Sequence, residues 1–196
     1  MAKLGTKERL LATSRRLLAT QGYSGTGLKQ VTDEARTPWG SMYHFFPGGK
    51  KQLAAEAIYA AAAADNELLE AAFVKSPDAR TAIQRIFKAE RRRIEASDFT
   101  EGCPVGTVAL DVPSSAGDVR EACAAAFASW GKTISAALAH AGLTDSEARS
   151  FATFTLSALE GATMLSRTFK SSLPLRQSAT MVDTALAAIL ERAARA

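Results

Sequence analysis

The sequence predicts an all-α protein made of two helical domains. Strand-type alternation of apolar and polar residues is scarce, alanine is abundant, and β-branched residues are nowhere concentrated in short bounded runs. The sharpest break in the chain is Pro47-Gly48-Gly49, where a helix is not expected to continue. We therefore expect an N-terminal domain at residues 1–47 and a larger helical domain at residues 48–196.

The first helix is expected to begin after Thr6, an N-cap residue type, and to stop at Gly22. Spacings of three and four residues give it one face directed at a core: Leu10, Ser14, Leu17, Leu18 and Gln21.

Two short helices follow, joined by a tight turn. The first of them spans about residues 27–35, with Thr26 as its expected N-cap. The next has Thr37 as its N-cap, Pro38 at its first position and Phe45-Phe46 at its end. Two short helices joined in this way have the geometry of a helix-turn-helix, whose second helix enters the major groove of DNA.

Each short helix has an apolar side, and the second also has a polar one. The expected core positions are Leu28, Val31, Ala35, Met42 and Phe45 or Phe46. The other side of the second short helix presents side chains that bind phosphates and touch base edges: Trp39, Ser41, Tyr43 and His44.

The basic residues are concentrated in this part of the chain. Residues 1–51 carry nine Lys or Arg against three acids, whereas the remaining 145 residues carry fifteen against seventeen. A basic segment that also has a helix-turn-helix pattern is typical of a protein that binds nucleic acid.

The larger domain is expected to be helical throughout. Lys50-Lys51 opens a long alanine-rich helix that runs to about Phe73. Further helices are expected at residues 78–98, 104–111, 115–141, 145–170 and 175–194, with glycine, proline and serine between them.

Three strings of residues resemble the DNA-binding signature of the tetracycline-repressor (TetR) family in order and spacing. They are Thr26-Gly27-Leu28-Lys29-Gln30-Val31, Gly40-Ser41-Met42-Tyr43-His44-Phe45-Phe46 and Gly48-Gly49-Lys50-Lys51-Gln52-Leu53. The resemblance covers about residues 6–60, and beyond them only the all-helical architecture is similar. The stretch Gly102-Cys103-Pro104-Val105-Gly106 also resembles a multidrug-responsive subgroup associated with the control of drug export.

The resemblance implies DNA-contacting roles at matching positions. Thr26 would contact a phosphate, Tyr43 and His44 would contact the DNA backbone, and Lys50 or Lys51 would neutralise a phosphate at a helix start. The full expected DNA-binding set is Thr26, Lys29, Thr37, Pro38, Trp39, Gly40, Ser41, Tyr43, His44, Lys50 and Lys51.

The chain departs from the family pattern at the turn. Arg36 stands where the family has glycine, and Pro38 and Trp39 replace small residues or lysine. Arg36 must then adopt the backbone conformation that the turn imposes, at some strain. Structural alternatives stay open for the candidate residues: an N-cap role for Thr26, a cap role for His44, a core position for Tyr43, packing of Trp39 on the first helix, and ordinary solvated lysines at 50 and 51.

The sequence carries no catalytic constellation, so no enzyme activity, cofactor or metal is expected. The two histidines, His44 and His140, are too few for a cluster of imidazole ligands. Neither a phosphate loop nor a nucleophile elbow is complete. Cys103 and Cys123 are expected to be small hydrophobic residues of a reducing compartment. With neither an apolar leader nor a long apolar run, a cytoplasmic protein without membrane contact is expected.

Aromatic side chains among small residues in the larger domain predict an apolar effector pocket. The candidate lining residues are Phe73, Phe87, Phe127, Trp130 and Met164, with Arg91 and Glu160 as polar groups. The alternative for each is a plain core position.

Two apolar stripes near heptad spacing predict a dimer interface formed by the last two helices. The candidate interface residues are Phe151, Phe154, Ala158, Leu165, Val182, Leu186 and Ile189. The alternative is that both stripes belong to the core of a single subunit.

Together these patterns predict a homodimeric TetR-like repressor that leaves a palindromic operator in double-stranded DNA when a small, largely apolar effector binds. One rival is a helical small-molecule-binding or enzymatic protein with a vestigial helix-turn-helix. Another is a nucleoid-type protein with non-specific DNA affinity. Lack of salt-dependent DNA binding would indicate the first rival, and equal binding to operator and scrambled duplex would indicate the second.

Overall fold

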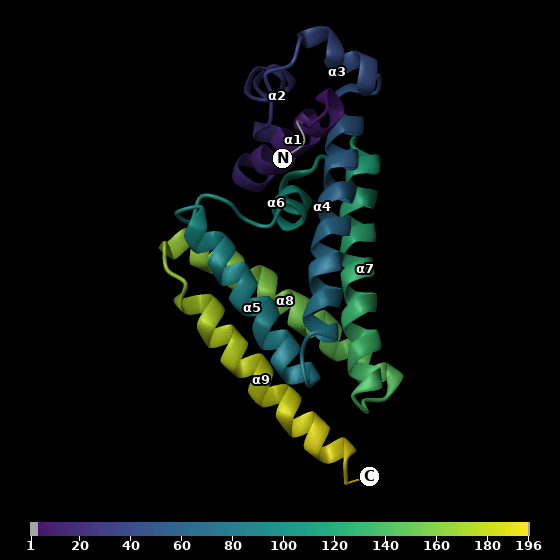
Figure 1. Cartoon of the computed structure of the whole chain (residues 1–196), viewed down its shortest axis with the longest axis vertical. Coiled ribbons are helices and arrows are strands. Elements are labelled where there is room, and N and C mark those ends of the chain that lie inside the picture. Colours follow the sequence, from purple (N-terminus) through teal and green to yellow (C-terminus); the bar gives the residue numbers. More distant parts are fainter. Residues whose placement is uncertain (1–3, 196) are drawn as a thin grey trace. The chain divides into compact units, whose positions relative to one another are not determined.

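The computed structural model describes residues 4–195, and this part of the chain is helical and contains no strand (Figure 1). The helices are α1 (Thr6–Gly25), α2 (Leu28–Glu34), α3 (Trp39–Phe45), α4 (Gly49–Val74), α5 (Ala79–Ala96), α6 (Pro104–Asp111), α7 (Gly117–His140), α8 (Asp145–Phe169) and α9 (Leu173–Ala193). The all-α prediction is confirmed. Across the described residues, no helix is both long and apolar enough to cross a membrane.

The helix starts and ends follow local chemistry, with differences at the N-terminal helices. Gly5 is the N-cap of α1, in place of the predicted Thr6. Gly22 breaks α1 as predicted, with φ 73° and ψ −173°, but one more helical turn follows it. Thr26 therefore forms the C-cap of α1, and Gly27 is the N-cap of α2. The prediction that Thr26 caps α2 was wrong, because α2 begins one residue later and the Thr26 hydroxyl donates back to Gly22 O. The prediction that Thr37 caps α3 was also wrong, because Pro38 is the N-cap and Trp39 the first helical residue.

The chain packs as two compact units. The N-terminal unit runs to Ala63 and adds Cys103–Ala126, so it contains α1–α3, α6 and parts of α4 and α7. The C-terminal unit consists of Ala64–Gly102 and the chain from Phe127 onward. The N-terminal packing unit thus extends past the sequence break at Pro47 and takes in a segment that follows residue 102.

The N-terminal unit has a small core beneath the helix-turn-helix. Its buried residues are Leu10, Leu17, Val31, Ala35, Met42, Phe46 and Leu53. Phe46 is fully buried, whereas Phe45 and Leu28 pack against the core from its edge. The core positions predicted from the periodicity of the short helices are therefore confirmed.

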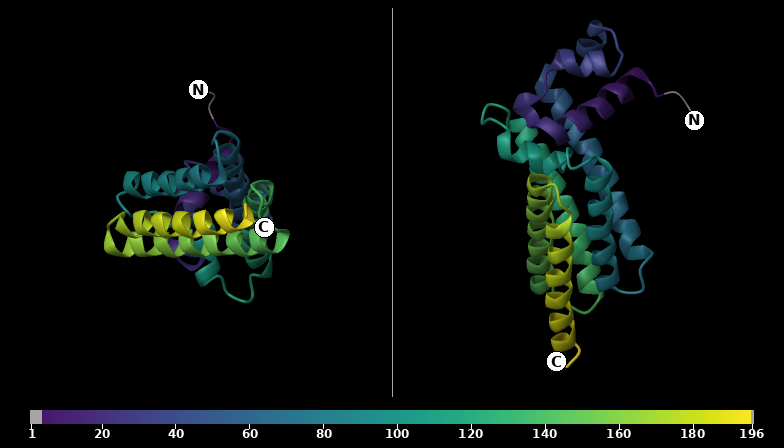
Figure 2. Two further views of the ribbon diagram at one scale, coloured as in Figure 1. Left: turned by 90° about the horizontal axis from the view of Figure 1, so that it is seen from below. Right: turned by 90° about the vertical axis from the view of Figure 1, so that its left-hand side faces the viewer.

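The core of the C-terminal unit lies between α5, α8 and α9, and Figure 2 shows α8 and α9 running side by side. Its largest fully buried side chains include Ile83, Ile94 and Leu186. Polar contacts add to the apolar ones: the Arg80 guanidinium donates to both carboxylate oxygens of Asp183, at 2.9 and 2.7 Å, which fixes α5 against α9.

Candidate nucleic-acid interface

The turn between α2 and α3 has the strain that the sequence predicts. Arg36 has φ 52°, in the left-handed region that glycine occupies at low cost. Its N–H donates to Asp33 O at 3.1 Å, and the next N–H, of Thr37, donates to Thr32 O at 3.0 Å. These two bonds close the turn and set the direction in which α3 leaves it.

The outward side of α3 is built from exposed aromatic residues. Trp39 and Tyr43 are 49% and 50% exposed, and their rings pack edge to face with centroids 5.7 Å apart. His44 is exposed as well and packs edge to face on Phe45 at 4.8 Å. Gly40 has open space where a side chain would be. Neither Tyr43 nor Trp39 is a core residue within the N-terminal unit.

Thr26 lies beneath the surface that it was predicted to help form. It is 4% exposed, and its hydroxyl donates to Gly22 O at 2.6 Å. Thr37 and Ser41 are half-buried beside the turn. The sequence motif did not reveal that the Thr26 hydroxyl already has a partner within the unit.

The candidate lysines also have partners. Lys29 is exposed and pairs with Asp33, at 3.1 and 3.0 Å. The Nζ of Lys50 lies 4.5 Å from the centroid of the Tyr23 ring, and burial lowers the pKa of Lys50. Lys51 Nζ donates to Ser115 O at 2.7 Å. The first turn of α4 is thus tied to other parts of the N-terminal unit.

Sequence reasoning missed the carboxylate of Asp111, which accepts hydrogen bonds from the end of α1, just before the helix-turn-helix. Asp111, the last residue of α6, accepts hydrogen bonds from the backbone N–H groups of Tyr23 and Ser24. These residues are 88 and 87 positions apart along the chain, and no local pattern announces the contact.

In the C-terminal unit the predicted effector residues do not share one environment. Phe87 and Trp130 are buried, with Phe87 in the hydrophobic core, and Met164 lies on the surface. Phe127 is half-buried and packs edge to face on Trp130 at 5.5 Å. The remaining candidates are half-buried: Phe73, Arg91 and Glu160.

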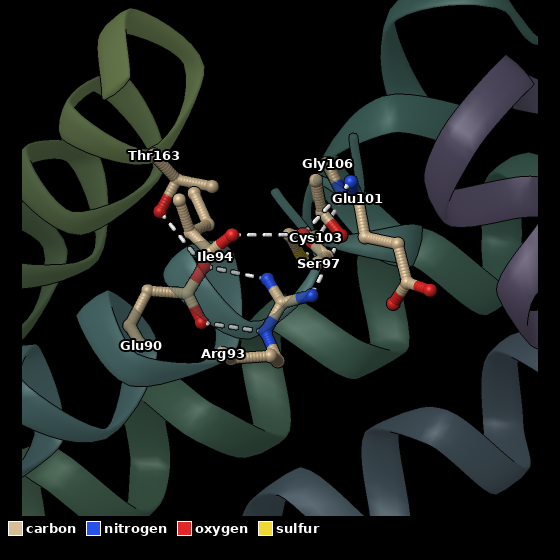
Figure 3. A network of polar contacts seen from close by, with 9 residues as sticks. Glu90, Arg93, Ile94, Ser97, Glu101, Cys103, Gly106 and Thr163 are labelled. Atoms are coloured by element: carbon tan, nitrogen blue, oxygen red, sulfur yellow. Dashed lines mark hydrogen bonds and ion pairs between the residues drawn. The ribbon is translucent and has the colours of Figure 1, made fainter. Parts of the chain in front are cut away.

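A polar network that the sequence did not single out joins α5 to α8 (Figure 3). The Glu90 carboxylate accepts from Arg93 Nε at 2.9 Å and from the Thr163 hydroxyl at 2.9 Å. Arg93 also donates to Gly102 O at 2.9 Å, in the segment that precedes α6. The arrangement links α8 through α5 to Gly102, all within the C-terminal unit.

The predicted dimer stripes divide into buried and exposed residues. Phe151, Val182 and Leu186 are buried in the core of their own unit, and Ala158 and Ile189 pack against it. For these residues the single-subunit alternative describes the packing that is observed. Phe154 and Leu165 are instead 47% and 42% exposed, and further exposed apolar residues lie on α8 and α9: Met164, Phe169, Leu173 and Met181.

Within residues 4–195, no group of three or more His, Cys, Asp or Glu side chains is placed to hold a metal ion. The candidate interface itself is a surface of aromatic, hydroxyl and cationic groups on a helix-turn-helix.

Comparison with known proteins agrees with this architecture. Residues 10–57 match the profile of bacterial regulatory proteins of the tetR family, and residues 79–181 match that of the LmrA/YxaF-like transcriptional regulator C-terminal domain. The HTH-type transcriptional regulator YxaF of Bacillus subtilis is 35% identical over 170 residues, 87% of this chain and 89% of YxaF.

Solved structures share the fold. A TetR transcriptional regulator from Legionella pneumophila has a TM-score of 0.85 at 22% identity, covering 94% of this chain and 99% of that chain. The TetR family regulator CifR, solved in complex with a 26-base-pair operator, has a TM-score of 0.77 at 20% identity, covering 96% and 99%. From the family profiles and the relationship to YxaF, the chain belongs to the TetR family of DNA-binding transcriptional regulators.

Proposed function

We propose that the protein is a homodimeric repressor that binds a palindromic operator in double-stranded DNA and is released by a small, largely apolar effector. The observation that carries the DNA-binding half is the exposed face of α3 on a unit whose first 51 residues hold nine cations against three acids. The CifR complex with operator DNA supports the same binding mode by analogy of fold. A regulator of this kind acts in the cytoplasm, where the DNA lies.

In the proposed complex, α3 enters the major groove. The Trp39 ring contributes apolar contact with a thymine methyl or a sugar, and the Tyr43 hydroxyl and His44 donate to phosphates. Lys51, at the start of α4, adds a phosphate site, favoured by the positive end of the helix dipole. Phosphate contacts fix the register of the helix-turn-helix on the duplex, and the exposed start of α3 contacts the base edges.

The second subunit is proposed to cover the exposed apolar residues of α8 and α9. Phe154 and Leu165 are the members of the predicted stripes that remain exposed, and Phe169 extends their side of α8. An identical copy satisfies this surface and also supplies a second head, which a palindrome read at successive major grooves requires.

Effector control requires two states with different affinities. An effector that binds the DNA-incompetent state about a hundredfold more tightly shifts the balance by about 2.7 kcal/mol. The half-buried aromatic residues of the C-terminal unit, Phe73 and Phe127, are proposed as part of its site, with Arg91 and Glu160 as polar selectors.

The test begins with a duplex selected from random sequence by the purified protein. Binding to the selected and to a scrambled duplex is measured by fluorescence anisotropy over a salt series. The expected result is selective binding that weakens steeply as salt rises. Equal binding to both duplexes would indicate a nucleoid-type protein, and no salt-dependent binding by folded protein would indicate a vestigial helix-turn-helix.

Matched variants sharpen the result. Tyr43→Phe removes one hydroxyl from α3, whereas Tyr59→Phe removes a hydroxyl from a tyrosine of similar exposure (49%) on α4. Only Tyr43→Phe should weaken binding, and because the lost hydroxyl is uncharged the salt slope should stay that of the wild type. For the dimer, Phe154→Glu with Leu165→Glu should give a monomer in sedimentation. Val74→Glu, at an exposed apolar position on α4 outside the predicted stripes, should leave the mass unchanged.

A further inference from the structure

Asp111 closes a break in α1. The φ of 73° at Gly22 interrupts the helix, and a new turn begins with Tyr23 and Ser24. The first N–H groups of a helical turn have no carbonyl of a preceding turn in reach. Asp111 supplies the acceptors: Oδ1 accepts from Tyr23 N at 2.9 Å and Oδ2 from Ser24 N at 2.8 Å, and the Ser24 hydroxyl lies 3.4 Å from Asp111 O.

The approach of the carboxylate depends on Gly22. A Cβ at this position would lie 2.7 Å from Asp111 Oδ2 and 2.9 Å from its Cγ. The positive φ and this close approach both require a residue without a side chain. Gly22 and Asp111 therefore form one structural element, although they lie in different helices.

The turn that Asp111 holds leads directly into the helix-turn-helix. Thr26 N donates to Tyr23 O at 3.2 Å, and the Thr26 hydroxyl donates back to Gly22 O, immediately before the N-cap of α2. On its other side the turn meets the start of α4, since Lys50 Nζ lies over the Tyr23 ring and 3.4 Å from Ser24 O. The entry to α2 and the first turn of α4 thus rest on the same short segment.

We propose that Asp111 is a positioning residue for operator binding. Its carboxylate fixes the Tyr23-Ser24 turn. This turn then holds the start of α2 and the Lys50 side chain in the positions that bind DNA. The role is indirect, since a carboxylate near the duplex repels phosphate. The proposal rests on the proposed operator binding. It means that the helix-turn-helix depends for its position on a residue of α6.

Because Asp111 is negatively charged, electrostatics and positioning predict opposite effects of its removal on DNA affinity. Simple electrostatics predicts that neutralising an acid in the DNA-binding unit tightens binding. Positioning predicts the opposite for specific binding. Asp111→Ala should raise the Kd for the selected duplex about tenfold or more, equivalent to about 1.4 kcal/mol, and Asp111→Asn, which keeps one oxygen acceptor, should fall between this variant and the wild type.

Two readouts separate positioning from loss of fold. The substitution removes no cation, and misplacing Lys50 disturbs a single phosphate contact, so the salt slope for the selected duplex should fall by about 1 at most. The affinity for scrambled duplex should hold or tighten, so the ratio of specific to non-specific affinity falls. A loss of folded protein would lower both affinities equally. Glu121→Gln, which removes an exposed acid from α7 of the same unit, is the matched control and should leave the ratio unchanged.

Amide hydrogen exchange on the full-length protein tests the positioning itself, independently of DNA. In Asp111→Ala the amides of Tyr23, Ser24 and α2 should exchange faster, while those of α8 keep their protection. An unchanged specific-to-non-specific ratio with selective wild-type binding would overturn the proposal, as would faster exchange confined to Tyr23 and Ser24. If the wild type itself showed no selectivity, the proposed function would fail, and protection of α2 in the variant would still decide the positioning claim.

Discussion

Gly22→Ala is predicted to destabilise the fold strongly, although it adds only one methyl group. The backbone at Gly22 combines φ 73° with ψ −173°, a region populated almost only by glycine. Placing alanine there costs about 1–3 kcal/mol from backbone strain alone. The added Cβ also meets the Asp111 carboxylate at 2.7 Å, so this side chain must retreat. Weakening its two charge-assisted bonds to backbone N–H groups adds about 2 kcal/mol.

The expected loss in the free energy of unfolding is therefore about 3–5 kcal/mol, measured by urea unfolding followed by circular dichroism. Gly142→Ala is the matched control, because φ at Gly142 is +105° but an added Cβ has no heavy atom within 4 Å. It should cost only the backbone contribution, about 1–2 kcal/mol.

A double-mutant cycle isolates the clash. In an Asp111→Ala background, Gly22→Ala should lose its steric part and cost about as much as Gly142→Ala, which leaves a coupling energy of about 2 kcal/mol. Equal costs for Gly22→Ala with and without Asp111, or a cost no larger than that of Gly142→Ala in the wild type, would refute the reasoning.

Three further predictions concern single groups. Asp78→Ala removes the cap of α5, a carboxylate oxygen 2.7 Å from Thr81 N, and should cost about 1 kcal/mol at neutral pH. This backbone hydrogen bond lowers the pKa of Asp78. The contribution of Asp78 to the free energy of unfolding is therefore present above the pKa of unfolded aspartate and is lost as pH falls through the folded pKa. The urea midpoints of wild type and variant should converge in acid. Burial raises the pKa of Cys123 to about 11, leaving about 0.1% thiolate at pH 8, so a disulfide reagent should modify half-buried Cys103 first and Cys123 only in denaturant. Arg36→Gly should raise the free energy of unfolding by about 1 kcal/mol by relieving the positive φ, and a lower urea midpoint would contradict this.

The parts of the fold that the sequence predicts well are those set by local chemistry. The break at Gly22 and the helix that begins at Pro104 follow from the backbone preferences of glycine and proline themselves. The strain at Arg36 was expected from the resemblance, because the TetR family has glycine at this position. The periodicity of the short helices likewise identifies Val31 and Met42 as core, because neighbouring turns of one helix share a face.

Partners distant in sequence could not be predicted in the same way. An apolar stripe records that a face avoids water but not which surface covers it. Val182 and Phe154 both belong to predicted dimer stripes, yet one is buried in its own unit and the other is exposed. The pairing of Asp111 with the Tyr23-Ser24 turn depends on the packing of α6 against α1, for which a single sequence holds no local signal.

The same limit applies to charge. Counting nine cations in the first 51 residues suggests a head that binds phosphate through many independent contacts. In the structure Arg16 is paired with Glu34, Lys29 with Asp33, and Lys7 with Glu56. A cation that is already paired releases less free energy when it meets a phosphate, since its first partner must be given up or shared. The salt dependence of binding should therefore correspond to fewer phosphates per helix-turn-helix than its number of cations. The affinity should depend more on how the turn at Tyr23 places the start of α4 than on the net charge of the unit.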